Sequence, residues 1–258
     1  MAPVAPVLLI PPSEGKAEGG DGAPIDVGGG RFAGLAAERL IVRDAVRRML
    51  AAGAGGSLLG VRGPHLERAL NEWRDLDASP TMPAARRYTG VVWGGIDIAS
   101  LPAPARRRAV SRIVVTSGLW GLVGAGDAIP AYRLKMGARV DGLGSLAAWW
   151  RPTISAALAR RAGRGAVIDM LPLDHRAVID PSALRSGSLV RVGIVEDGPG
   201  GRRAAGHAGK HLKGLLARAI LEHDARTLDD VAAVRVEGLS LLSVERGGVA
   251  EVTFLREG

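Results

Sequence analysis

Short aliphatic runs that end at glycine, proline or an acidic residue constrain the fold most. The first is VLLI at 7–10, which stops at a Pro-Pro pair, and similar runs occur at 111–121, 165–172 and 189–197. Runs this short, bounded by turn residues, are typical of buried strands. The chain is therefore expected to build a β-sheet, with the run at 111–121 as its clearest strand.

Other segments carry helical patterns. We expect helices at 35–50, 66–73, 147–163 and 207–223, with Pro152 in the first turn of the third. The last is the best amphipathic helix. Its apolar residues recur at helical spacing on one face: Leu212, Leu215, Leu216, Ala219 and Ile220.

The remaining segments suggest turns and antiparallel strands. Residues 13–30 form a glycine-rich loop, 79–87 a turn-rich connection, and 88–98 a partly extended segment. The tail at 231–255 alternates and turns at Gly-Gly, as closing antiparallel strands do. No repeat and no long linker divides the chain. We therefore predict a single α+β domain over residues 1–258, with a central mixed β-sheet flanked by helices.

Composition excludes some functions and suggests a partner. There is no cysteine, which excludes disulfides, thiol catalysis and cysteine metal sites. The net charge of +8 suits a polyanion such as nucleic acid, although a general preference for arginine would produce it too. No apolar stretch of about 18 residues suggests a membrane span, and the first residues lack the charged region of a signal peptide. A cytoplasmic protein without membrane contact is expected.

The rarity of lysine singles out four positions. The sequence has 30 arginines but only four lysines: Lys16, Lys135, Lys210 and Lys213. A buried or crowded lysine can lose its proton and act as a base or nucleophile, whereas an arginine cannot. Each of the four lysines is therefore a candidate for a position whose chemistry requires an amine.

The loop after the first run contains SEGKA and presents Ser13, Glu14 and Lys16 together. It is not a P-loop, because the GxxxxGK[ST] spacing is absent and Ala17 follows the lysine. The alternative to a binding site is a solvated loop.

The densest cluster of polar residues lies at 117–140, after the clearest strand. It contains Ser117, Asp127, Tyr132, Arg133 and Lys135. Loops at strand ends are common binding positions. The chain has only two tyrosines, Tyr88 and Tyr132, both near arginines. They could line a pocket or be half-buried structural residues.

The segment 204–218 carries His207, Lys210 and Lys213 and no acidic residue. The two lysines are three residues apart and would share one helix face. Such a face binds an anion or lets the two cations depress each other's pKa. The alternative is a solvated basic face. The histidines lack carboxylate companions, so the sequence indicates no metal site and no cofactor.

The segment 58–70 has features of a helix-hairpin-helix element. In such an element glycines let backbone N–H groups approach a DNA phosphate. The turn here is GVRG rather than the usual three-residue hairpin, with Gly60, Val61, Arg62 and Gly63 as the residues that would contact phosphate. An ordinary connection between two helices is the alternative.

The order of these motifs resembles that of the YaaA peroxide stress protein family, over about residues 7–255. The matching motifs are PPSEGK, Tyr88-Thr89-Gly90, SGLWG at 117–121, Asp127, PAYRLKMG at 130–137, the helix beginning AAWW, and Lys210, Lys213 and Gly214. Two motifs depart from the family pattern. VIDMLP keeps Asp169 but loses the polar pair that follows in relatives, and only His207 survives in the segment before Lys210.

The resemblance implies a protein of the oxidative stress response that limits free iron and the resulting damage to DNA. It also implies an unusual α+β fold and double-stranded DNA binding, without sequence specificity, through a helix-hairpin-helix element and a basic cleft. The residues that would track DNA phosphates are Gly60, Arg62, Gly63, Arg106, Arg107, Arg108, Arg112, Lys210 and Lys213.

The alternative is an enzyme that acts on a small anionic molecule, and the sequence leaves open whether the protein is an enzyme. Lys16 would be the base or nucleophile, assisted by Ser13 and Tyr132. The substrate's anionic groups would be bound or positioned by a wider set: Glu14, Tyr88, Ser117, Asp127, Arg133, Lys135, His207, Lys210 and Lys213. Both hypotheses expect the lysines of distant segments to gather in one basic hollow.

Overall fold

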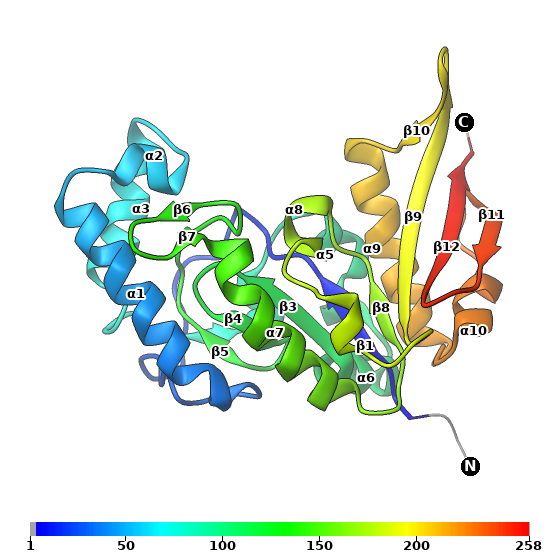
Figure 1. Ribbon diagram of the computed structural model, residues 1–258, viewed down its shortest axis with the longest axis horizontal. Coiled ribbons are helices and arrows are strands. Elements are labelled where there is room, and N and C mark those ends of the chain that lie inside the picture. The colour runs from blue at the N-terminus through cyan, green and yellow to red at the C-terminus, as the bar shows by residue number, and fades with distance from the viewer. Residues whose placement is uncertain (1–3, 258) are drawn as a thin grey trace.

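One mixed sheet forms the centre of the protein. In the computed structural model, which describes residues 4–257, this sheet has eight strands in the order β11–β12–β9–β8–β1–β3–β4, with β10 paired to β9 (Figure 1). Helices cover it on both sides. The prediction of a single α+β domain around a central mixed sheet is confirmed.

The interior of the sheet is parallel and its edges are antiparallel. Parallel pairs join β1 to β3 and β8, β8 to β9, and β9 to β12. Antiparallel pairs join β3 to β4, β9 to β10, and β11 to β12. The bounds are β1 (Val7–Ile10), β3 (Ile113–Ser117), β4 (Gly121–Gly124), β8 (Val167–Asp169), β9 (Leu189–Gly198), β10 (Gly201–Ala204), β11 (Leu239–Glu245) and β12 (Val249–Arg256).

Burial explains why the sequences of these strands are short apolar runs. Every residue of β1, β3, β4 and β8 is buried, because helices cover both faces of the parallel region. Two small antiparallel pairs lie apart from the main sheet: β2 (Met82–Pro83) with β5 (Ala128–Ile129), and β6 (Arg139–Val140) with β7 (Gly144–Ser145).

Two groups of helices lie at opposite ends of the molecule. The first three gather at one end, and α9 and α10 lie beside the β9–β12 region at the other (Figure 1). None of the described helices is long and apolar enough to cross a bilayer. The bounds are α1 (Ala36–Ala51), α2 (Gly55–Leu59), α3 (Pro64–Arg74), α4 (Ala84–Arg87), α5 (Val91–Ile96), α6 (Ala103–Arg112), α7 (Leu146–Ala162), α8 (Leu173–Arg176), α9 (His207–Glu222) and α10 (Leu228–Ala233).

The expectation of a partly extended segment at 88–98 is wrong, because Val91–Ile96 forms α5. This helix packs closely against α9. A Cβ built on Gly214 would lie 2.3 Å from the carbonyl oxygen of Val92 and 2.8 Å from the Cα of Gly95. Two glycines thus let the helix backbones approach, and tertiary packing stabilises a short, glycine-containing helix that its own sequence does not favour.

The position of Pro152 also differs from the prediction. It lies inside α7, which begins at Leu146, and not in its first turn. Leu146 and Trp150 are fully buried, and the Trp150 indole donates to the Gly118 carbonyl at 2.9 Å. These contacts stabilise the turns before Pro152, despite the backbone hydrogen bond that proline cannot make.

The parallel strands place several loops at one edge of the sheet. β1 is followed by β3 on one side, whereas β8, on the other side of β1, is followed by β9. The connections therefore leave in opposite directions from β1 and β8. In open parallel sheets, ligands bind outside the carboxyl ends of the strands at such a point.

Candidate functional site

Lys16 lies against the two tyrosines of the chain. Its ammonium donates to the carbonyl of Ser13 at 3.1 Å. The Nζ atom lies 4.3 Å from the centroid of the Tyr132 ring and 5.6 Å from that of Tyr88. The side chain is half-buried. A cation at this distance from an aromatic face is stabilised by the ring quadrupole, most strongly where water is excluded.

The tyrosine hydroxyls belong to a buried chain of hydrogen bonds. Tyr132 bonds to Ser117 at 2.7 Å and to Tyr88 at 2.9 Å. Ser117 Oγ also accepts the N–H groups of Leu119 and Trp120. Because these two bonds occupy the hydroxyl's two lone pairs, Ser117 must donate to Tyr132, and Tyr132 to Tyr88. Ser117 therefore orients the tyrosine hydroxyls.

Burial changes the proton affinity of these groups. It lowers the pKa of Lys16 to about 8, and the positive charge of Arg133 acts in the same direction. The carboxylates of Glu72 and Glu14 oppose this shift. Burial also raises the pKa of Tyr132 to about 12, so its hydroxyl stays neutral. The site can therefore present a neutral amine beside neutral phenols close to pH 8.

A buried arginine fixes the loop that carries Lys16. Arg87 is fully buried and donates to the carbonyls of Ala17 at 2.5 Å, Pro80 at 3.1 Å and Ile129 at 3.1 Å. Ala17 returns a backbone hydrogen bond to the Arg87 carbonyl at 2.8 Å. One guanidinium thus joins three segments that are remote in sequence.

The Ser13 hydroxyl is engaged in holding the same loop. It accepts the N–H of Thr89 at 3.0 Å and donates to the carbonyl of Gly15. These bonds dock the loop on the segment after α4. The geometry supports a positioning role for Ser13 more than the catalytic role expected from the sequence.

Glu14 links the first loop to the 117–140 segment. Its carboxylate accepts from Arg133 at 2.9 Å and pairs with Lys135 at 3.5 Å. The hydrogen bond from Arg133 is the main reason that the pKa of Glu14 is lowered. Arg133 also donates to the Leu59 carbonyl at the end of α2 at 3.1 Å. The prediction that these residues lie together is therefore matched by the geometry.

Lys213 has a different set of neighbours. Its ammonium contacts the carbonyl of Met170 at 3.4 Å, just after β8. Burial lowers its pKa to about 8, and the charge of Arg176 adds to the shift. Asp169 is fully buried and accepts from Arg176 at 2.7 Å.

The lysines have different immediate neighbours. Lys135 pairs with Glu14, whose charge also acts on Lys16, whereas the charge of Asp169 acts on Lys213. His207 and Lys210 are exposed on α9, and neither side chain makes a hydrogen bond or ion pair within the described part of the chain. The single lysine-lined hollow expected from the sequence therefore stays a prediction.

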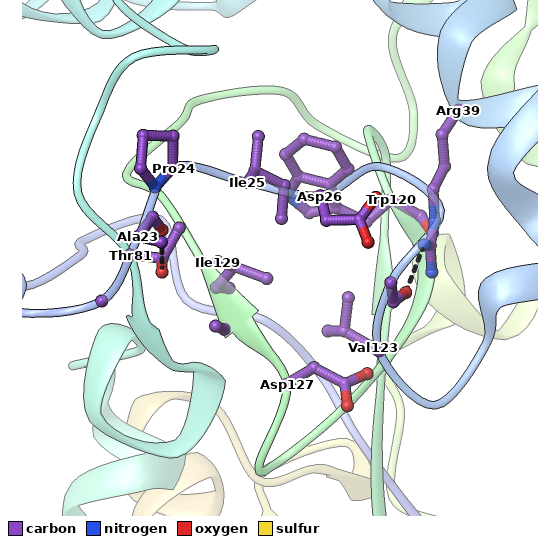
Figure 2. Close-up of a pocket in the computed structure, with 14 residues that line it drawn as sticks. Ala23, Pro24, Ile25, Asp26, Arg39, Thr81, Trp120, Val123, Asp127 and Ile129 are labelled. Atoms are coloured by element: carbon purple, nitrogen blue, oxygen red, sulfur yellow. Dashed lines mark hydrogen bonds between the residues drawn. The ribbon is translucent and has the colours of Figure 1, made fainter.

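Asp127, expected among the anion-binding residues, has a structural role. It accepts the backbone N–H groups of Arg31 at 3.0 Å and Gly124 at 2.7 Å. It lines a cavity of about 230 Å³ together with Trp120 and residues of the glycine-rich loop (Figure 2). The same cavity is bordered by Arg39, whose buried guanidinium donates to four backbone carbonyls.

Apart from Lys210 and Lys213 on α9, the residues expected to contact DNA fall into two separate groups. Gly60, Arg62 and Gly63 lie in the turn between α2 and α3, and Lys135 packs against Gly60 with its Nζ 3.2 Å from where a Cβ would be. Both glycines have positive φ, 65° and 54°, which favours glycine there. Arg62 is exposed.

The second group lies on α6, away from that turn (Figure 1). Arg106 and Arg107 are exposed, but Arg108 donates to the Leu221 carbonyl at 2.6 Å. Arg112 is 4 % exposed and paired with Asp224, so its guanidinium is not available to a phosphate. Arg112 is therefore removed from the candidate DNA-binding residues.

Several residues of the site were missed from the sequence. Arg87, Arg176 and His175 belong to unremarkable segments, and nothing in the local pattern marks them among 30 arginines and five histidines. Thr116 was recoverable, because it directly precedes Ser117 at the end of a predicted strand. Its hydroxyl bonds to the Nδ1 of His175 at 2.8 Å.

Comparison with known proteins places the chain in a family. Residues 8–243 match the sequence profile described as peroxide stress protein YaaA. A UPF0246 protein of Streptomyces coelicolor is 35% identical over 245 residues, covering 93% of this chain and 91% of the relative. A UPF0246 protein of Corynebacterium glutamicum is 34% identical over 245 residues, covering 88% of this chain and 91% of the relative. The chain therefore belongs to the peroxide stress protein YaaA family.

Proposed function

We propose that the protein acts in the peroxide stress response by binding double-stranded DNA without sequence specificity. The observation that carries this proposal is the α2–α3 turn, where Arg62 is exposed and Lys135 lies against Gly60. Two cationic side chains thus flank a glycine turn at the beginning of a helix.

The backbone of this turn suits a phosphate. A Cβ on Gly63 would meet nothing within 4 Å, so the outer side of the turn is open. Pro64 has no N–H, and the N–H of Leu66 donates to the Gly63 carbonyl at 2.9 Å, so His65 is left as the backbone donor in the first turn of α3, where the helix dipole favours an anion. Such contacts read the shape and charge of the DNA backbone and not its bases.

Membership of the family supports a role in peroxide stress. Peroxide damages DNA through iron-dependent chemistry, and the resemblance implies proteins that limit it. A protein bound along duplex DNA in the cytoplasm would reduce the access of iron and peroxide to the strands. Nonspecific binding suits this role because damage occurs at any sequence.

The experiment compares two exposed arginines by fluorescence anisotropy with a labelled DNA duplex. Arg62→Gln should weaken binding and reduce the slope of log affinity against log salt by about one, as expected for the loss of one phosphate contact. Arg164→Gln removes the same charge from an exposed position just after α7, outside both groups of candidate residues, and should change neither quantity. Binding that is absent at low salt, or that does not change between about 50 and 300 mM salt, would overturn the proposal.

A second candidate function is an enzyme that acts on a small anionic substrate at Lys16. The observation that favours it is the half-buried amine over the Tyr132 ring, with its pKa lowered to about 8. A neutral amine can take a proton or attack a carbonyl carbon, and a Schiff base then forms with loss of water. Tyr88 and Arg133 would position the substrate.

The Lys16→Arg variant separates the two candidates because it keeps the positive charge. DNA binding should be unchanged, whereas catalysis should be lost. Treatment of the wild-type protein with borohydride and a panel of small keto acids should leave a mass adduct on Lys16 if the amine is a nucleophile. An unmodified Lys16 in every reaction would exclude that role.

A further inference from the structure

The surroundings of Lys213 leave a positive charge without compensation. The side chain is half-buried on α9, and its one recorded contact is the Met170 carbonyl at 3.4 Å, which is a long hydrogen bond. Among the residues that the structure describes, no carboxylate lies within ion-pair distance of its ammonium. Burying a charge without a partner is costly, so this arrangement calls for an anion.

The nearby carboxylate of Asp169 does not fill that need. One of its oxygens accepts the backbone N–H of Leu171 at 2.8 Å, and the other accepts from Arg176 at 2.7 Å. Asp169 thus compensates Arg176, and the charge of Lys213 is left over. The cluster of these three ionised side chains carries a net positive charge.

Arg176 retains donors that could contact a ligand. Its Nε is used by Asp169 and its Nη2 by the Leu171 carbonyl at 3.3 Å, while its Nη1 has no recorded partner within residues 4–257. The side chain is 23% exposed, so the guanidinium is partly accessible. An arginine fixed by a buried carboxylate offers a rigid donor to an oxyanion.

The helix that carries Arg176 is held on both sides of β1. Arg176 bonds to Asp169 at the end of β8, and His175 bonds to Thr116 near the end of β3. In the sheet, β1 lies between these two strands. Burial lowers the pKa of His175 to about 4, so the ring is neutral at pH 7 and adds no charge. α8 therefore spans the strand ends as a fixed support.

We propose that Lys213 and Arg176 bind a small oxyanion, a carboxylate or a phosphate group, at the carboxyl end of β8. The position agrees with the general location of ligands in parallel sheets, beside the strands from which the connections diverge. The site requires neither the DNA-binding role nor the Lys16 role, because the contacts that define it involve neither the α2–α3 turn nor Lys16. An ammonium and a guanidinium on one side of an anion suit a compact ligand with two or more oxygens.

The test uses two lysines of the same helix. Lys213→Gln removes the proposed ligand, and Lys210→Gln removes an equal charge from an exposed position three residues away. Thermal unfolding is followed with inorganic phosphate, and separately with acetate, at constant ionic strength. Wild type and Lys210→Gln should be stabilised in a saturable manner, whereas Lys213→Gln should bind about tenfold or more weakly.

If the Lys213→Gln variant does not fold, a second measurement on the wild-type protein still tests the site. The four lysines give four ¹³Cε signals in the wild-type protein. The anion that stabilises the protein should shift the Lys213 signal and raise the pKa of that amine. The other charged groups around the amine are the same with and without the anion: Asp169 from β8, Arg176 from α8 and Lys210 on the same helix. The Lys16 signal should not move. The site is refuted if neither anion gives a saturable shift at Lys213, or if Lys210→Gln loses as much affinity as Lys213→Gln. The stronger of the two anions identifies the ligand group.

Discussion

The ammonium of Lys16 lies over the face of the Tyr132 ring, 4.3 Å from its centroid. The rings of Trp120 and Tyr132 meet in a T-shaped arrangement, with centroids 5.9 Å apart. Lys16 therefore exchanges part of its hydration for an aromatic face and one carbonyl. That exchange leaves an amine that gives up its proton more readily than an exposed lysine does.

This exchange predicts a pH-dependent contribution to stability. The folded pKa of Lys16 is about 8, whereas the unfolded value is near 10.5, so the unfolded chain binds more protons between these limits. The unfolding free energy should thus rise from pH 8 towards 10, with the rise reduced in Lys16→Met. Above about pH 10 the buried tyrosines act in the opposite direction, because their phenols ionise first in the unfolded chain. Urea denaturation across this range tests the prediction, and equal slopes for wild type and variant would contradict it.

The hydrogen bonds of Tyr132 predict an order among tyrosine variants. Tyr132→Phe removes a hydroxyl that bonds to both Ser117 and Tyr88, whereas Tyr88→Phe removes only the last bond of the chain. We expect losses of about 2–3 kcal/mol for the first variant and about 1 kcal/mol for the second in urea denaturation. A Tyr88→Phe variant that is the less stable of the two would show that the bonds run in another order.

The close approach of α5 and α9 predicts opposite effects of two alanines. Gly214→Ala would place a methyl group 2.3 Å from the Val92 carbonyl, so we expect a loss of about 3 kcal/mol or more. Gly94→Ala, also within this helix pair, meets nothing within 4 Å and should gain about 0.5–1 kcal/mol. Calorimetric unfolding would measure both. A tolerated Gly214→Ala would mean that the helices are not packed this closely.

The three carbonyls bound by Arg87 predict that lysine cannot replace it. A single ammonium lacks the planar fork that reaches three segments, so Arg87→Lys should lose about 3 kcal/mol and expose the 13–22 loop to proteolysis. Arg86→Lys is the matched control. That side chain is 63% exposed, and its ion pair with Asp21 is long, at 3.9 Å. The free energy of unfolding of Arg86→Lys should therefore stay within about 0.5 kcal/mol of wild type. Equal protease resistance in both variants would argue against the anchoring role.

Local patterns were sufficient for much of the fold. The run at 7–10, the amphipathic helix at 207–223 and the turn at Gly-Gly in the tail are confirmed as β1, α9 and the β11–β12 pair. In each case the signal is the spacing of apolar side chains within one segment. The helix α5 was missed because its apolar residues and glycines acquire their meaning only when α9 packs against them.

The candidate site shows the same division. The scarcity of lysine directed attention to Lys16 and Lys213, and both prove to be half-buried amines with lowered pKa values. The same reasoning also selected Lys210, which is exposed. The scarcity of lysine in the sequence therefore singles out positions, but it does not predict the surroundings of each side chain.

The sequence by itself determined the strands, the main helices, the family and the segments that carry polar residues, because these depend on neighbours along the chain. Only the tertiary structure decided that Glu14 meets Arg133, that Lys16 lies over Tyr132 and that Lys213 lies near Asp169. Burial and electrostatic interaction depend on distance in space. Segments separated by more than a hundred residues are brought together only by the way the sheet orders its strands.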